Sequence, residues 1–147
     1  MFEVLLFFLH LKKSTIKDPR FILRGGDITK LNSSGFPCKF IANSTNWRFK
    51  NGGVGINKVI HDAAGPLLFE ETKKRYQTAA IGSAYSVPLP SASPLHKDGG
   101  VDWVIHVNAP SMDKGRPDSI TDLDDASTAL KKCYVSLFET FYKLASS

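Results

Sequence analysis

The stretch that decides the fold is IANSTNWRFKNGGVGINKVIHDAAG, residues Ile41–Gly65. It overlaps a short apolar run, Lys39–Ala42, that is typical of a buried strand, and the polar residues Asn43–Asn46 follow. Next come the glycines of Asn51–Gly55, and apolar residues then recur at helical spacing over Ile56–Ala64. We therefore expect a strand, a polar turn, a glycine loop and a helix in this order.

This order of elements suits a ligand that carries phosphate and sugar groups. Glycines let the backbone approach an anion closely, and the first N–H groups of a following helix favour phosphate. The amides of Asn43 and Asn46 offer both donors and acceptors to sugar hydroxyls. A solvated surface turn before a helix explains the glycines equally well, because short glycine patterns match by chance.

Beyond this stretch, segments of strand composition alternate with segments of helical spacing. The predicted strands are Phe21–Leu23, Ser83–Leu89 and Val101–Val107. The predicted helices begin at Gly65-Pro66 and Asp122, and the predicted loops are Ser91–Gly100 and Asn108–Thr121. Such alternation predicts an α/β fold with a largely parallel sheet, whose ligands bind at the carboxyl ends of the strands.

The length of 147 residues fits one domain, which we expect over residues 1–147 with a core over about residues 20–145. The net charge of +5 favours anionic partners. The cysteines, Cys38 and Cys133, lie far apart, which argues against a zinc site or a disulfide framework and indicates an intracellular protein. The apolar segment Phe2–Leu11 is too short to span a bilayer and lacks the features of a signal peptide, so we expect no membrane attachment.

Several other residues invite a functional interpretation. We predict that His61 and His106 are structural, since no acid or cysteine lies at ligand spacing from them. Trp47 could stack on a base or sugar, whereas Trp103 is predicted to belong to the core. The basic run Lys73–Arg75 is interpreted as a solvated helix end.

Four segments, taken in order, resemble the signature of macro domains. They are Gly26–Thr29 (GDIT), Asn43–Gly65, Gly82–Ala84, and Val104–His106 with Pro110. In the second segment, Asn43 and Asn46 keep the spacing of the family's two asparagines, and Gly52, Gly53 and Gly55 fall on its run of glycines. The resemblance implies a three-layer α/β/α fold with a mixed, largely parallel sheet. It also implies binding of ADP-ribose or a related adenine nucleotide, with no cofactor or metal.

By this resemblance, the ligand follows one row of residues. Asp27 would accept a hydrogen bond from the adenine amino group, with Ile28 beside it. The ribose and phosphates would lie along Asn43, Asn46 and the loop residues Gly52, Gly53, Val54, Gly55 and Ile56.

Two departures from the family pattern bear on catalysis. Val54 replaces one glycine of the run, and Asn57 stands where hydrolytic members carry an aspartate. An asparagine cannot act as a general base, which favours binding without catalysis. An ADP-ribosyl hydrolase or ADP-ribose-phosphate phosphatase is the alternative, with Asn43, Asn46 and Asn57 as its candidate catalytic residues.

The chain stops after its last predicted helix, before the family's second phosphate loop, so we expect either a domain truncated at its C-terminus or a partner or parent chain that supplies the rest. The segments IANSTNWRFK, VPLPSASPL and SLFETF are similar to the macro region of plant aprataxin-like proteins, which are associated with nuclear DNA repair. This narrower resemblance implies a nuclear or cytoplasmic protein. Its partners would be ADP-ribosylated protein or nucleic acid and the other domains of a larger protein. A degenerate structural segment without a ligand is a third hypothesis.

Overall fold

A three-stranded mixed sheet lies at the centre of the computed structural model, which describes residues 25–52 and 54–147. Its strands are β1 (Phe40–Thr45), β2 (Ala84–Pro88) and β3 (Trp103–Asn108), in the order β1-β3-β2. β1 runs parallel to β3, and β2 runs antiparallel to it. The predicted strand Phe21–Leu23, the apolar segment Phe2–Leu11 and Gly53 lie outside the described residues.

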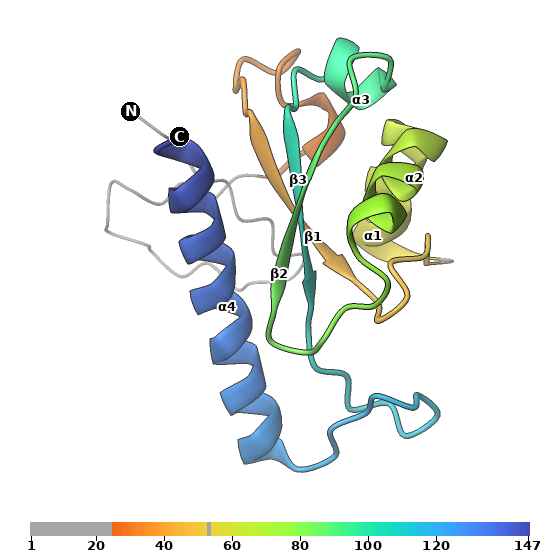
Figure 1. Ribbon diagram of the computed structural model, residues 1–147, viewed down its shortest axis with the longest axis vertical. Helices are drawn as coiled ribbons and strands as arrows, with labels where there is room; N and C mark the ends of the chain where they lie inside the picture. Colours follow the sequence, from red (N-terminus) through yellow and green to blue (C-terminus); the bar gives the residue numbers. More distant parts are fainter. Residues whose placement is uncertain (1–24, 53) are drawn as a thin grey trace.

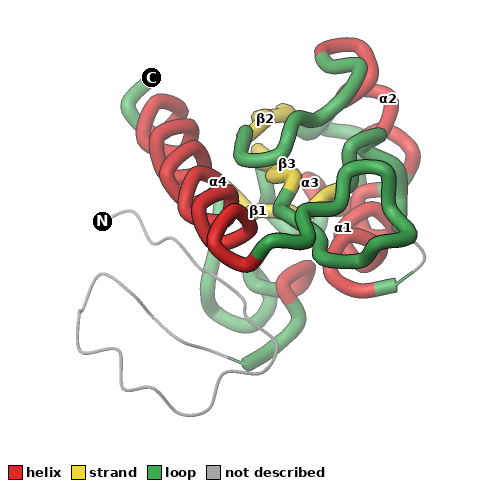
Figure 2. Tube along the Cα trace, turned by 90° about the horizontal axis from the view of Figure 1, so that it is seen from below, coloured by secondary structure: helices red, strands yellow, loops and turns green. Residues whose placement is uncertain are grey.

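Helices cover both faces of the sheet (Figure 1). α1 (Gly55–Ala64) and α2 (Pro66–Arg75) lie on one face, and α4 (Leu123–Ala145) lies on the other. The view from below shows the same three layers (Figure 2). Two short helices, η1 (Ile28–Lys30) and α3 (Pro94–Lys97), contact α1. The predicted three-layer α/β/α architecture with a mixed sheet is therefore confirmed.

The core is divided by the sheet into two clusters, as the alternation of side chains along a strand requires. Val104 of β3 packs with Ile60 of α1 and Leu68 of α2. The next residue, Ile105, points to the opposite face and packs with Leu137 and Phe141 of α4. Each helical layer therefore has its own apolar contact with the same strand.

Gly65 joins the two helices of one layer. Its φ of +71° is unfavourable for other residues, and its N–H donates to the carbonyl of His61 at 3.0 Å, which ends α1. Pro66 then occupies the first turn of α2, where a missing N–H costs nothing. The predicted break between the two helices is confirmed.

α4 begins and ends where the charges of the sequence indicate. The side chain of Asp122 accepts a hydrogen bond from the N–H of Asp125 at 2.9 Å and caps the helix. Asp124 adds to the acidic first turn, and Lys143 lies in the last turn, as the helix dipole favours. Within residues 25–52 and 54–147, no helix is both long and apolar enough to cross a membrane.

β1 extends three residues further than the sequence predicts. We expected a strand over Lys39–Ala42 and a polar turn over Asn43–Asn46, but β1 continues to Thr45. Asn43 and Thr45 are buried and pair with His106 and Asn108 of β3. The polar residues thus belong to the strand because polar partners on β3 face them. Trp103, predicted to be core, is only half-buried.

The packing of α4 on the sheet can be tested by truncating Leu137, which is 7% exposed. We expect Leu137→Ala to lower the free energy of unfolding by about 2–4 kcal/mol, because it leaves a cavity between α4 and β3. The matched control is Leu123→Ala in the same helix, where the side chain is 67% exposed and the expected change is within about 0.5 kcal/mol. Urea unfolding of both variants measures the difference. Equal losses of the free energy of unfolding would contradict the packing of Leu137 between α4 and the sheet.

Candidate functional site

Three chain segments meet at the carboxyl ends of the parallel strands. Thr45, the last residue of β1, pairs with Asn108, the last residue of β3, so the loops that follow them leave from one edge of the sheet (Figure 1). Ile81 forms a bridge with Asn108, and the N–H of Gly82 donates to the Asn108 carbonyl at 3.1 Å. Ligands of α/β sheets bind at such an edge.

Asn46 shapes the turn that leaves β1. Its side-chain oxygen accepts hydrogen bonds from the N–H groups of Arg48, at 3.1 Å, and Lys50, at 3.2 Å. Its amide nitrogen donates to the Lys50 carbonyl at 2.7 Å. The side chain that we predicted to bind a sugar is thus engaged by its own loop, and a contact of Asn46 with a ligand stays a prediction.

Phe49 anchors this turn in the core. It is fully buried and packs against Tyr76, Tyr85 and His106, with ring centroids 5.2–6.1 Å apart. Its φ of +59° is the one positive value for a non-glycine residue within the described part of the chain. Such a conformation costs about 1 kcal/mol or more, and the three hydrogen bonds of Asn46 offset it.

The glycine loop leads into a helix whose first turn has no side-chain cap. Val54 precedes α1 with an exposed side chain that makes no capping hydrogen bond, and Gly55 begins the helix with a φ of +79°. A β-carbon on Gly52 would lie 3.2 Å from the Asn57 amide nitrogen, so the loop packs tightly here. Ile56 is half-buried in the core beneath. Since no side chain of the described residues caps the first N–H groups of α1, these groups are available to solvent or an anion.

Asp27 lies on η1, which packs against α1. One carboxylate oxygen accepts hydrogen bonds from the hydroxyl and the N–H of Thr29, at 2.7 and 2.9 Å. These two bonds lower the pKa of Asp27, so the exposed carboxylate is charged at neutral pH. Its second oxygen faces Lys30 at 3.8 Å, and Ile28 below it is buried.

A buried chain of hydrogen bonds connects the loop to three elements. The amide nitrogen of Asn43 donates to the Asn57 side-chain oxygen at 2.8 Å and contacts Nδ1 of His106 at 2.9 Å. Asn57 in turn donates to the Lys50 carbonyl at 2.8 Å. Asn43 Oδ1 is buried and has no partner among the described residues. The network thus joins β1, β3, α1 and the turn.

The direction of these bonds fixes the protonation of His106. Because Asn43 donates to Nδ1, the proton of the neutral ring resides on Nε2, which donates to the Thr72 hydroxyl at 3.2 Å. That hydroxyl donates to the Leu68 carbonyl at 2.6 Å. Burial, and to a lesser extent the neighbouring His61, lowers the pKa of His106 to about 3. His106 is a neutral structural histidine, as predicted.

His61 differs from its neighbour. Its ring stacks on that of His106 with centroids 5.8 Å apart, and burial lowers its pKa. Its Nε2 is buried and makes no hydrogen bond within the described chain, so it is not a satisfied core histidine in the sense we expected. Among residues 25–52 and 54–147, no group of three or more His, Cys, Asp or Glu could hold a metal ion.

The basic run at the end of α2 does not act as one cluster. Lys74 and Arg75 both bind the carboxylate of Glu71, each at 2.5 Å. Lys73 instead donates to the Gln77 carbonyl, and its nitrogen lies 6.0 Å from the ring centroid of Phe49. All three side chains are nevertheless exposed in the last turn of α2, so the interpretation as a solvated helix end is confirmed.

The structure brings three of the predicted site residues together. Asn46 and Asn57 both donate to the Lys50 carbonyl, and Asn43 is connected to them through Asn57. Asn43 and Asn57 are buried. Sequence reasoning missed Thr72, which lies fifteen residues beyond Asn57 on another helix. No motif in the sequence around Thr72 could have indicated its contact with His106.

The buried imidazole predicts a pH dependence of stability. The folded pKa of His106 is about 3, below the unfolded value of 6.5, so the unfolded chain binds more protons between these values. The stabilising contribution of neutral His106 is therefore fully present above about pH 6.5. Below that pH, the free energy of unfolding falls by about 1.4 kcal/mol per pH unit. From pH 7 to pH 5 we expect a loss of about 2 kcal/mol, and the lowered pKa of His61 acts in the same direction.

Chemical denaturation at pH 7, 6 and 5 measures this slope. His106→Gln is the control, because glutamine does not titrate: the variant should be less stable at pH 7 but should show a smaller slope. An unchanged slope would show that His106 does not cause it.

The comparisons with known proteins agree with this geometry. The family model described as "Macro domain" matches residues 42–145, from the third residue of β1 to the end of α4. An Arabidopsis thaliana protein named Transcription factor bHLH140 is 46% identical over 131 residues, which is 88% of this chain but 14% of that protein.

Two solved structures share the fold over most of this chain. The Oryza sativa APL macrodomain in complex with ADP-ribose has a TM-score of 0.83 and 46% identity, over 86% of this chain and 63% of that one. A Dictyostelium discoideum ADP-ribose binding macrodomain has a TM-score of 0.69 and 29% identity, over 84% and 59%. The chain thus spans less than two thirds of each solved relative. With the match of the family model, these likenesses show that the chain belongs to the macro domain family.

Proposed function

We propose that this chain binds ADP-ribose at the carboxyl edge of β1 and β3. The observation that carries the proposal is the uncapped N-terminus of α1, which opens from a glycine loop at this edge. Backbone N–H groups at such a place bind phosphate, because they lack partners and lie at the positive end of the helix dipole. The names of the Oryza and Dictyostelium relatives, which describe ADP-ribose complexed or bound, support the same ligand.

The polar groups around α1 suit the two ends of this ligand. Asp27 presents a charged carboxylate oxygen beside α1, and a carboxylate accepts the hydrogen bond of an adenine amino group. Asn43 Oδ1 lacks a donor among the described residues, and a ribose hydroxyl could supply one. Glycines at positions 52 and 55 keep side chains away from the pyrophosphate between them.

Binding without turnover fits the side chains of this edge better than hydrolysis. By the family resemblance, Asn57 stands where hydrolytic members carry an aspartate. Its oxygen accepts a hydrogen bond from Asn43, and its nitrogen donates one to the Lys50 carbonyl. An amide has no ionisable group with which to activate a water molecule. No observation on the other candidates, Asn43 and Asn46, favours a catalytic role.

We propose further that the chain is the macro region of an aprataxin-like protein that acts in the nucleus in DNA repair. The similarity of IANSTNWRFK, VPLPSASPL and SLFETF to that group supports this origin. The small share of the Arabidopsis relative that the chain spans is compatible with neighbouring domains as partners.

The proposed adenine contact is tested by Asp27→Asn. Asparagine keeps the size of the side chain and can still cap η1, but its amide nitrogen cannot accept the adenine amino proton. We expect ADP-ribose affinity to fall about tenfold or more, because a charge-assisted hydrogen bond is lost. Isothermal titration with ADP-ribose, with AMP for comparison, measures the change.

A matched control is Asp98→Asn, at an exposed residue that ends α3. Its affinity should equal that of the parent chain. The proposal is wrong if the folded parent chain gives no heat with ADP-ribose, or if both variants bind like the parent.

The proposed role in repair predicts where the protein is found in the cell after DNA damage. The chain, fused to a fluorescent protein, should collect at damaged DNA in plant nuclei, because ADP-ribosylated proteins accumulate there. The Asp27→Asn fusion should collect less. A fusion that stays evenly distributed after damage would contradict this role, although it would leave ADP-ribose binding intact.

A further inference from the structure

Three basic side chains beside the turn have no carboxylate partner among the described residues. Arg48 and Lys50 follow β1, and Lys73 lies on α2. Nearby charges are neutralised in pairs, Lys58 by Asp62, and Lys74 and Arg75 by Glu71. Unpaired cations repel one another, so a surface that gathers them favours an anionic partner.

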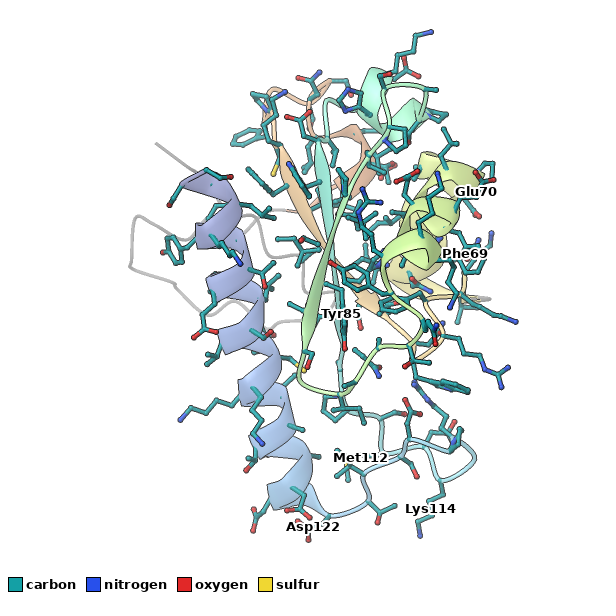
Figure 3. The ribbon with its side chains drawn as sticks, viewed as in Figure 1. Phe69, Glu70, Tyr85, Met112, Lys114 and Asp122 are labelled. Carbon is teal, nitrogen blue, oxygen red and sulfur yellow. The ribbon has the colours of Figure 1, made fainter. Side chains whose placement is uncertain are left out.

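Lys73 lies beside the turn that carries the other two cations. The nitrogen of Lys73 is 6.0 Å from the ring centroid of Phe49, the residue between Arg48 and Lys50 in the turn. Lys50 also lines a hollow of about 610 Å³ together with Phe69 of α2. Phe69 precedes Lys73 by one helical turn and points outward from α2, away from the sheet (Figure 3).

An aromatic ring lies next to the cations on each of the two elements: Trp47 in the turn and Phe69 on α2. Trp47 is half-buried, and the guanidinium of Arg48 lies 4.2 Å from the centroid of its ring. The Trp47 carbonyl accepts a hydrogen bond from Ala79 at 2.8 Å, which holds the residue in place. Phe69 is likewise half-buried in the wall of the hollow. We call Trp47, Arg48, Lys50, Phe69 and Lys73 the basic–aromatic surface.

We propose that the basic–aromatic surface binds single-stranded nucleic acid. Proteins that bind single strands combine cations that contact the phosphates with aromatic rings on which the bases stack. Here Arg48, Lys50 and Lys73 supply the cations, and Trp47 and Phe69 supply the rings. The pI of about 9.3 agrees with a polyanionic partner. Two exposed acids lie nearby: Glu70 follows Phe69, and Asp62 lines the hollow but pairs with Lys58. The carboxylate of Glu70 does not balance three cations.

The aromatic rings argue for a single strand over a duplex. In a duplex the bases are already stacked on one another, so Trp47 and Phe69 could not reach their faces. None of these five residues belongs to the set proposed to hold ADP-ribose. Either interaction can therefore be lost without the other.

The test is fluorescence anisotropy of a labelled 20-nucleotide single strand with the 147-residue chain, at several salt concentrations. The triple variant Arg48→Ala, Lys50→Ala, Lys73→Ala should bind at least tenfold more weakly at low salt. Its plot of log affinity against log salt should be flatter by about 2, since each lost phosphate contact removes about 0.7 from the slope. Trp47→Ala should weaken binding about tenfold through lost stacking.

The matched control removes the same charge from the opposite layer. Lys131→Ala, Lys132→Ala, Lys143→Ala lowers the net charge of the chain equally, but all three side chains are on α4. This variant should bind nearly like the parent. If both triple variants lose affinity equally, binding is due to overall charge and the proposal fails.

A direct signal comes from Trp103→Phe, which leaves Trp47 as the single tryptophan of the chain. Bases stacked on Trp47 should quench its fluorescence in step with the anisotropy. The proposal is overturned if the fluorescence does not change, if a duplex of the same sequence binds as tightly, or if an ADP-ribose polymer binds where the oligonucleotide does not.

Discussion

The rest of the structure depends on the amide of one buried side chain, Asn43, which connects β1 with β3 and with α1. One N–H donates to Asn57 on α1, and the other donates to His106 on β3, which passes the connection to Thr72 on α2. Each bond contributes about 0.5–1.5 kcal/mol on balance, but loss of one partner leaves other buried groups unsatisfied. The two parallel strands and the helical layer above them are therefore held in register by polar contacts as well as by apolar packing.

The ligand edge takes its shape from the same network. The Lys50 carbonyl accepts hydrogen bonds from both Asn57 and Asn46, so this one peptide group joins the buried hydrogen-bond network to the exposed turn. Phe49, next to it, is driven into the core in a backbone conformation that few residues adopt. The turn that precedes the glycine loop is therefore fixed, and no side chain of the described residues caps the N–H groups that begin α1. A preorganised turn costs less entropy on ligand binding than a mobile one.

Much of the architecture could be predicted from the periodicity of apolar residues, since α1, α2, α4 and each described strand lie within a few residues of their expected places. The short helices η1 and α3 were not predicted, and α3 lies in the predicted loop Ser91–Gly100. The extension of β1 could not, because the burial of Asn43 depends on His106, sixty-three residues away. Nor could the fate of Lys73, Lys74 and Arg75 be predicted: adjacent in sequence, they separate because Glu71 reaches two of them. Local patterns report spacing along the chain, whereas these outcomes depend on which side chains the fold brings together.

The fixed tautomer of His106 makes this ring a natural reporter of the ligand edge. Its Nε2–H is buried and donates to Thr72, so its proton should exchange slowly with solvent and give a distinct signal in a nitrogen-edited NMR spectrum. Three hydrogen bonds, through Asn43 and Asn57, connect the imidazole to the Lys50 carbonyl. A ligand that shifts this carbonyl changes the polarisation of all three hydrogen bonds. Ligand binding at the surface is then visible as a change in the chemical shift of a proton in the middle of the domain, without a dye attached to the site.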